Sequence, residues 1–386
     1  MSRPPPGLFR FCPFHPFSPV GVAACAALVC CLVGGLTLLA GFHRYDGVCC
    51  SFADPLRDQP FLDMWVRWDA RWYVSIATRG YEFLGGQQSS VAFFPLYPLL
   101  MRAVHGVTGL SAFLTGILLT LACGLGAVAL FHRWALRMVP EGPARLATLL
   151  LSLWPFAWYL YGAVYSDALF LLLVVGAFLS LEQGRVEWAT LLGALATATR
   201  PLAPALVLGL LARQLERRLR AGERLGPRDF LPLFAGAGLG AYMLYQWWRF
   251  GTPTAFVQAQ AGWNQSVGLT HILKIPFFTE GGWLIHGRYA LPNGLLALLF
   301  LGLCVPMWRR LGWGYTVYAV LAMGIPLLVS HSFVGLGRYA LAVFPCFVML
   351  ALTLETRPRA RVAWFSASVV LLGVLLARFT VGRFVA

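Results

Sequence analysis

One aspartate stands out in a chain that carries few charged residues. Asp69 lies in the run RWDARWY at residues 67–73, where the neighbouring arginines favour its ionised form and the apolar side chains oppose it. A carboxylate in such surroundings is suited to accept a proton as a general base. The alternative is structural, in which Asp69 only pairs with Arg67 or Arg71.

Two arginines supply the charge opposite to that of Asp69. Arg200 interrupts the apolar run 194–211 just before a proline, and a charge in such a run is costly unless it faces a cavity or a partner. Arg338 stands at the mouth of a later apolar segment. Two guanidinium groups on one side of a membrane can hold an anion such as a phosphate. Otherwise Arg338 extends to the interface, or either arginine forms an ion pair with an aspartate.

Asp167 is a second candidate acid, at the start of an apolar run. An acid at a helix N-terminus is explained by capping and by the helix dipole. The other interpretation makes Asp167 part of the site, where it binds the acceptor or a divalent metal. The chain has no P-loop, no HExxH and no Asp-x-Asp pair, and its nine cysteines show no CxxC spacing. No cofactor is therefore expected, and a metal at Asp167 stays open.

These residues have to be positioned by membrane helices. The 386-residue chain is 59% hydrophobic and 12% charged, whereas a soluble domain has roughly 25% charged residues. Its net charge of +15 comes from arginines that separate apolar runs, as in cytoplasmic membrane loops, so no nucleic-acid partner is expected. We predict an all-α polytopic membrane protein, one domain over residues 1–386, with membrane lipids around it.

Apolar runs of spanning length predict about ten or eleven transmembrane helices. The run 187–213 is interrupted by prolines after Arg200 and fits two short helices that meet there. The N-terminal run is long enough to span and is expected to be a retained helix, not a signal peptide. Apart from 187–213, the runs lie near residues 20–42 (the N-terminal run), 110–131, 146–163, 166–182, 230–248, 290–308, 313–330, 338–355 and 362–380.

Arginine positions orient these helices. A cytoplasmic N-terminus places the basic clusters at 133–145, 213–228, 309–310 and 357–361 on the cytoplasmic side, as the positive-inside rule requires. Arg378 and Arg383 then fall outside, which is against this rule. The same choice places the loops 43–109 and 249–289 and the turn 331–337 outside.

The first of these loops is expected to carry an amphipathic helix at the membrane interface. Trp and Tyr favour headgroup level, and helical spacing relates its apolar positions Trp65, Trp68, Trp72, Tyr73 and Ile76. The pair Cys49–Cys50 in this loop leaves a disulfide open.

The motifs, in their order along the chain, resemble those of the PIG-V family of mannosyltransferases. Asp167 stands where many relatives have glutamate. Ala203 stands where a glycine often follows the family's Arg-Pro turn. The matching segments are WDARWY at 68–73, AFFP at 92–95, YSDALF at 165–170, Thr199-Arg200-Pro201, Gly251-Thr252-Pro253 with Phe256, Gln260 and Trp263, and Arg338-Tyr339 with Phe344-Pro345.

This resemblance implies a GT-C-like fold and a transferase that uses a lipid-phosphate sugar. The implied donor is polyprenyl-phosphate mannose or a close relative, and the implied acceptor is a hydroxyl of a lipid or glycan. Asp69 would be the base of an inverting displacement, and Arg200 and Arg338 would stabilise the departing phosphate. The other implied substrate-binding residues are Trp68, Arg71, Trp72, Tyr73, Phe94, Asp167, Gln260, Trp263 and Tyr339.

Other functions fit parts of the same pattern. Within the GT-C class the sugar can instead be arabinose or glucose. A transporter or lipid flippase would place charge on broken helices, as at Arg200, but would also show internal repeats, and the chain has no convincing one. A non-catalytic scaffold is the third option. The arginine-rich, lysine-poor composition indicates a bacterial plasma-membrane protein with its site outside, and an acceptor other than glycosylphosphatidylinositol.

Overall fold

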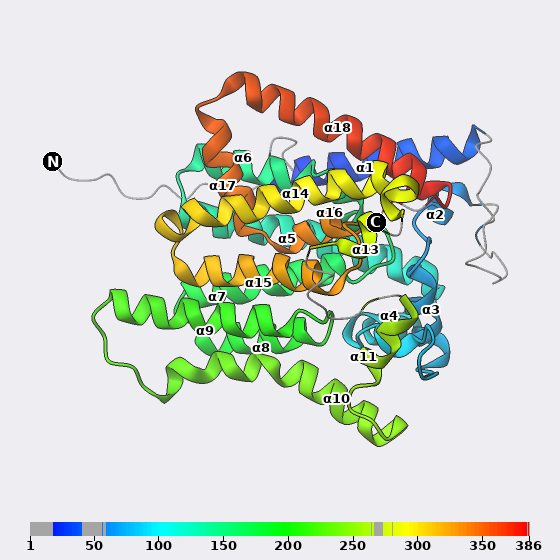
Figure 1. Ribbon diagram of the computed structural model, residues 1–386, viewed down its shortest axis with the longest axis horizontal. Coiled ribbons are helices and arrows are strands. Elements are labelled where there is room, and N and C mark those ends of the chain that lie inside the picture. Colours follow the sequence, from blue (N-terminus) through cyan, green and yellow to red (C-terminus); the bar gives the residue numbers. More distant parts are fainter. Residues whose placement is uncertain are drawn as a thin grey trace.

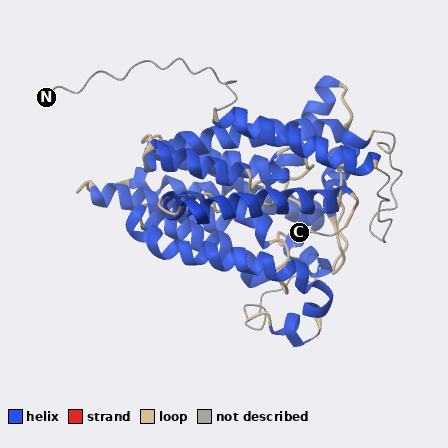
Figure 2. Ribbon diagram, turned by 90° about the horizontal axis from the view of Figure 1, so that it is seen from above, coloured by secondary structure: helices blue, strands red, loops and turns tan. Residues whose placement is uncertain are grey.

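The computed structural model describes residues 18–40, 56, 59–263, 265, 273–279, 281–383 and 385, without the side chains of residues 276 and 282–289. Cys49 and Cys50 lie outside these ranges. Every regular element in the described part is a helix, and Figure 2 shows helices joined by loops without a strand. The all-α prediction is confirmed for this part of the chain.

Long helices lie side by side in one elongated bundle (Figure 1). They are α1 (Pro19–Leu39), α5 (Ala112–Met138), α6 (Glu141–Ser152), α7 (Asp167–Glu182), α8 (Val186–Thr197), α9 (Ala203–Arg220), α10 (Ala237–Phe250), α14 (Gly282–Arg310), α15 (Trp313–Val329), α17 (Pro345–Glu355) and α18 (Pro358–Thr380).

Further helices and 3-10 turns connect the helices of the bundle. These connecting α-helices are α2 (Pro60–Asp63), α3 (Ala70–Arg79), α4 (Leu96–Thr108), α11 (Ala255–Gln260), α13 (Ile275–Thr279) and α16 (Leu336–Tyr339). The 3-10 turns are η1 (Ser90–Ala92), η2 (Ala157–Leu160), η3 (Pro227–Gly236), η4 (Ala261–Trp263) and η5 (Ala340–Ala342).

Four of the described helices are long and apolar enough to cross a membrane, namely α1, α5, Ala290–Arg310 of α14, and α18. The segment Leu336–Ala342 and helix α17 form a fifth if this pair, bent by 95°, counts as one span. Helices α8 and α15 are apolar but shorter. The chain is thus an integral membrane protein, and the ten or eleven crossings stay a prediction.

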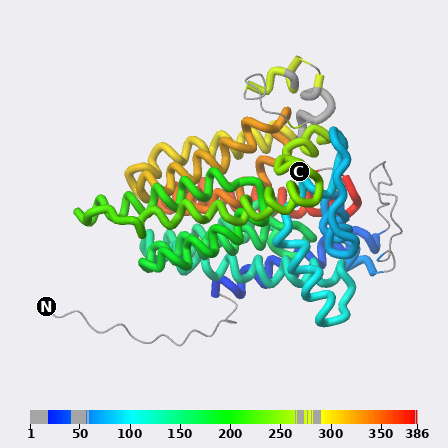
Figure 3. The backbone as a smooth tube through the Cα atoms, turned by 90° about the horizontal axis from the view of Figure 1, so that it is seen from below, coloured from blue at the N-terminus to red at the C-terminus, as the bar shows by residue number. Residues whose placement is uncertain are grey.

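The basic clusters and the motif-bearing segments lie at opposite ends of the bundle. The connections α5–α6, α9–η3, α14–α15 and α17–α18 lie at one end, on the left in Figure 1. Helices α3, α4, α11 and α16 gather at the other end, and Figure 3 shows α3 and α4 there from below. The fold therefore separates the two groups of residues in the way that the charge pattern predicts.

Helices α8 and α9 meet at Arg200 as predicted. Helix α8 ends at Thr197 and α9 begins at Ala203, because prolines at 201 and 204 remove backbone N–H donors that a continuous helix needs. The run 146–163 also breaks. Helix α6 stops at Ser152, and the buried irregular segment that follows contains η2 and leads to α7.

The first loop carries its amphipathic helix later than the sequence predicts. Helix α3 begins at Ala70, because Trp68 has a φ of +53°, which a right-handed helix does not accommodate. Trp65 and Ile76 are buried against the protein. The loop thus carries a helix as predicted, but the helix includes neither Trp65 nor Trp68, and its place at the membrane interface stays a prediction.

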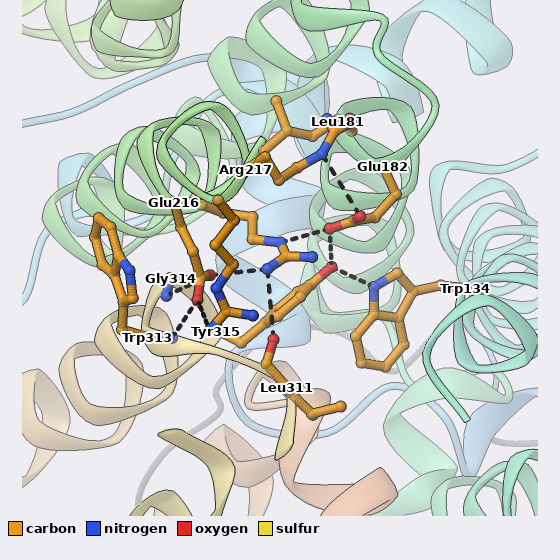
Figure 4. Close-up of polar contacts among 11 residues, drawn as sticks. Trp134, Leu181, Glu182, Glu216, Arg217, Leu311, Trp313, Gly314 and Tyr315 are labelled. Carbon is orange, nitrogen blue, oxygen red and sulfur yellow. Dashed lines mark hydrogen bonds and ion pairs between the residues drawn. The ribbon is translucent and has the colours of Figure 1, made fainter. Parts of the chain in front are cut away.

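A buried polar network closes the bundle at the end of the basic clusters (Figure 4). Arg213 Nε lies 2.6 Å from Glu182 Oε1, and Arg213 Nη1 lies 2.8 Å from Glu216 Oε2. The Tyr315 hydroxyl donates to Glu182 at 2.8 Å and accepts from the Trp134 indole N–H at 2.7 Å. Arg213, which the sequence assigns to a cytoplasmic loop, is instead a buried bridge between α7, α9 and α15.

Helix packing depends on close approach at Gly124 of α5, where an added Cβ would collide with the Leu160 carbonyl oxygen. We predict that Gly124→Ala lowers the free energy of unfolding by about 1–3 kcal/mol, the usual cost of overpacking. Gly302→Ala in α14 is the matched control, because its Cβ would meet nothing within 4 Å. Thermal unfolding of the detergent-purified variants checks this, and equal midpoints would contradict it.

Candidate functional site

The motif-bearing end of the bundle encloses a cavity of about 400 Å³. Its charged lining consists of Asp69, Asp167, Arg200 and Arg338. One wall is aromatic and is formed by Phe93, Phe94, Phe256 and Trp263. A further part of the lining is apolar and comes from the C-terminal part of α15 and the segment after it, with Ile325, Pro326, Val329 and Val334.

Asp167 is the buried centre of the charged lining. It is the first residue of α7 and is 4% exposed. Its carboxylate forms an ion pair with Arg200, which comes from the break between α8 and α9. The Arg200 guanidinium also lies over the rings of Phe170 at 5.9 Å and Tyr339 at 5.1 Å. Asp167 therefore does more than cap α7, because it holds the charge that the helix break introduces.

Arg338 lies between the two aspartates. Its Nη1 is 3.5 Å from Asp69 Oδ2, and its Nε is 3.8 Å from Asp167 Oδ1. Both distances exceed those of N–H···O hydrogen bonds, and the buried Nε has no hydrogen-bond partner among the described residues. Three rings surround the guanidinium, those of Tyr159, Tyr165 and Tyr339, at 5.3, 5.2 and 5.1 Å. The guanidinium is thus held by aromatic faces and keeps donor capacity.

Asp69 is the more accessible aspartate. Its side chain is 32% exposed and lines the cavity, whereas the Asp167 side chain is 3% exposed. Burial raises the pKa of Asp69 above the usual aspartate value, and the Arg338 guanidinium opposes this shift. A carboxylate that is more basic than usual and accessible from the cavity is suited to take a proton.

Most of the other predicted residues also line the cavity. They are Tyr73, Phe94, Gln260, Trp263 and Tyr339. Tyr73 follows Asp69 by four residues and therefore lies on the same face of α3. Its hydroxyl is 2.9 Å from the Ser166 hydroxyl at the start of α7, which joins α3 to α7 beside the charged lining.

Trp68, Arg71 and Trp72 are not among the residues that line this cavity, and their contact with a substrate stays a prediction. Successive helical residues turn by about 100°, so a helix that directs Tyr73 to the cavity directs its two predecessors elsewhere. Trp72 instead stacks on Phe93 at 5.7 Å and meets Trp263 edge-on at 5.8 Å. It supports the aromatic wall without forming its surface.

Several cavity residues were missed from the sequence. Ser166 stands beside Asp167 in the quoted motif, and its position next to an acid was the available signal. Phe93 lies in the quoted AFFP segment. The wall from α15 gave no signal, because its apolar residues resemble any membrane-facing run.

Two carboxylates and two arginines are a poor ligand set for a divalent metal. The described residues contain no group of three or more His, Cys, Asp or Glu side chains placed to hold a metal ion, and Mg²⁺ or Ca²⁺ prefers several oxygen ligands. A metal at Asp167 would also have to displace Arg200 and would lie close to Arg338. The donor set fits an anion better than a cation.

Known proteins share the part of the chain that carries three of these charged residues. Residues 46–218 match the family model described as Mannosyltransferase (PIG-V). This confirms the PIG-V resemblance. The PIG-V-type segment contains Asp69, Asp167 and Arg200, whereas Arg338 lies beyond it and joins the site only in the fold.

Curated relatives of this chain are named GPI alpha-1,6-mannosyltransferase 2. The human protein is 33% identical over 205 residues, which are 50% of this chain and 39% of that protein. The Rattus norvegicus protein is 37% identical over 145 residues, which are 35% and 28% of the two chains. The matched regions thus span about two fifths of the human relative's length and less of the rat relative's.

Among solved structures, the chain is similar to the Archaeoglobus fulgidus oligosaccharyltransferase in its apo form. The superposition covers 94% of this chain and 56% of that chain, with 13% sequence identity and a TM-score of 0.49.

The two aspartates should differ in their effect on stability. Asp167→Asn removes the buried partner of Arg200, and breaking a buried pair costs about 3–5 kcal/mol because the other charge stays buried. Asp69→Asn should cost much less, because Asp69 is partly exposed and lies 3.5 Å from its cation. Thermal unfolding checks this, and Asp167→Asn combined with Arg200→Met should recover part of the loss. Equal midpoints for the two single variants would contradict it.

Proposed function

We propose that the chain transfers mannose from polyprenyl-phosphate mannose to a hydroxyl of a lipid or glycan acceptor, with inversion at the anomeric carbon. One observation carries the proposal. An accessible carboxylate, Asp69, lines the same cavity as two buried guanidinium groups, and the nearer one is 3.5 Å away. The names of the relatives support mannose as the sugar.

The charged lining matches the charges of such a displacement. Asp69 accepts the proton of the acceptor hydroxyl as its oxygen bonds to the anomeric carbon from the face opposite the phosphate. The bond from that carbon to the phosphate oxygen breaks, and the phosphate leaves with the electron pair. Arg338, with its remaining donor capacity, and Arg200 stabilise the negative charge that grows on this phosphate. Asp167 keeps the two arginines in place before the donor arrives.

The two walls of the cavity suit different parts of the substrates. The apolar wall of Ile325, Pro326 and Val329 suits the first part of a polyprenyl chain, which then continues into the bilayer. The aromatic wall of Phe93 and Trp263 suits sugar rings, whose apolar faces pack on aromatic side chains. Gln260 at the edge of this wall offers both a donor and acceptors for sugar hydroxyls.

Helices α3 and α11, which contribute to the cavity lining, lie at the end of the bundle away from the basic clusters (Figure 1), which supports a site on the outer face of a bacterial plasma membrane. A sugar donor available there has to be carried by a lipid, because nucleotide sugars are cytoplasmic. The same chemistry serves arabinose or glucose, and the product of the reaction distinguishes these sugars. A transport role gains no support from Arg200, because its charge is paired with Asp167.

Replacing Asp69 by Asn tests the base directly. The variant keeps the shape and loses the proton acceptor, so turnover should fall by roughly 10²–10⁴-fold, the usual contribution of a general base. Turnover is measured as mannose transfer by the purified protein, and mass spectrometry of lipids and glycans from a deletion strain identifies the product. Glu141→Gln, which removes an exposed carboxylate on α6, is the control. Near-normal turnover of Asp69→Asn would refute the role.

Replacing Arg338 by Gln should change both donor use and pH dependence. The donor KM should rise and turnover should fall, because the phosphate loses a cation. The base works when ionised, so activity falls as pH drops through the pKa of Asp69. Arg338 lowers this pKa, so its removal should move the acidic limb of the pH–rate profile to higher pH. Arg249→Gln, an exposed arginine on α10, is the control. An unmoved acidic limb would show that Asp69 does not control it.

A further inference from the structure

We propose that Tyr165 is a positioning residue, whose hydroxyl fixes Asp69 by bridging the two peptide groups on either side of Trp68. This inference rests on the proposed role of Asp69 and adds to it the device that holds the carboxylate in place. Tyr165 lines no part of the cavity, so it acts through Asp69 and not on the substrate.

The bridge uses the full hydrogen-bonding capacity that one phenol offers here. The Asp69 backbone N–H donates to the Tyr165 oxygen at 3.1 Å, and the Tyr165 O–H donates to the Arg67 carbonyl at 3.1 Å. These two peptide groups flank Trp68, so the hydroxyl closes a turn that has Trp68 at its centre. A phenolic oxygen can donate one hydrogen bond and accept another, and both are used.

The bridge stabilises an unusual backbone conformation at Trp68. Its φ of +53° lies in the left-handed region, which is unusual for a bulky residue. Such a conformation persists only where surrounding contacts impose it. The turn sets the direction in which α3 leaves at Ala70, and it therefore sets where the Asp69 carboxylate points.

Tyr165 is itself firmly fixed. Its side chain is 2% exposed, and its ring meets that of Tyr159 edge-on at 4.9 Å. The residue before it, Val164, donates its backbone N–H to the Trp65 carbonyl at 3.1 Å. Two adjacent residues of this segment thus bond to the Trp65–Asp69 turn, so the turn is docked on the segment that leads into α7.

The same tyrosine also contacts the other charged partner. Its ring lies 5.2 Å from the Arg338 guanidinium, which is 3.5 Å from the Asp69 carboxylate. One side chain therefore orients the base through hydrogen bonds and supports the guanidinium through its ring. Replacing it by phenylalanine keeps the ring and removes only the bridge, which separates these two effects.

A purely structural role is the alternative, and the chain offers a matched control. Tyr161 lies on the same buried segment, is also 2% exposed, and donates its hydroxyl to the Ser152 carbonyl at 2.6 Å. Tyr161→Phe removes a buried tyrosine–carbonyl hydrogen bond as Tyr165→Phe does, but none of its described hydrogen bonds reaches the Arg67–Asp69 turn. Both variants should lose a similar amount of overall stability.

The experiment compares Tyr165→Phe, Tyr161→Phe and Asp69→Asn as full-length purified proteins. Hydrogen–deuterium exchange of a peptide that covers Met64–Tyr73 should become faster in Tyr165→Phe only. Turnover of mannose from polyprenyl-phosphate mannose should fall by roughly 10- to 100-fold in Tyr165→Phe, the cost of a small misplacement of a reacting group, with the donor KM little changed. Tyr161→Phe should keep the turnover of the unmodified protein.

The two readouts separate the possible failures. Unchanged exchange in Tyr165→Phe overturns the positioning role, whatever the activity. Faster exchange with the same turnover as Tyr161→Phe also overturns it, because the bridge would then not matter for the reaction. Full turnover in Asp69→Asn refutes the proposed function instead, and the exchange measurement still decides whether Tyr165 holds the turn.

Discussion

The site depends on the burial of Asp167 between two guanidinium groups. Its carboxylate pairs with Arg200 and lies 3.8 Å from Arg338, and without it the buried charge of Arg200 would lose its partner at a high cost in free energy. The three residues come from the start of α7, the break between α8 and α9, and the bent segment before α17. These charged contacts therefore join three distant parts of the chain, and the three residues line the cavity.

This charge balance leaves Asp69 free for chemistry. Asp167 is 4% exposed and pairs with Arg200, whereas Asp69 stays accessible, with a pKa raised by burial and lowered by Arg338. Similar side chains thus obtain different roles from their surroundings. Buried charges are also paired at the far end of the bundle. There the Arg213 guanidinium bonds to Glu182 and Glu216, and the network ties α9 to α7 and α15 while the other end keeps space for a ligand.

Sequence reasoning reached much of this arrangement and failed in specific places. The break at Arg200, the all-helical fold and the grouping of the motifs at one end followed from prolines, hydropathy and arginine positions. The start of α3 was placed too early, because helical spacing cannot reveal that Trp68 adopts a left-handed backbone. Of the residues predicted there, the fold directs Tyr73 into the cavity, while Trp72 packs on Phe93. The wall from α15 was invisible, since an apolar residue facing a cavity and one facing lipid look alike in sequence.

By itself the sequence determined which charges the membrane-embedded chain has to accommodate and in which segments they occur. Hydrophobicity, proline positions and arginine asymmetry are local properties, so they can be read directly from the chain. Only the tertiary structure decided which charge pairs with which, that Asp69 and not Asp167 remains accessible, and that Tyr165 bridges the turn around Trp68. These outcomes depend on distances between segments up to about 270 residues apart, such as Asp69 and Arg338, and on which face of each helix packing leaves open.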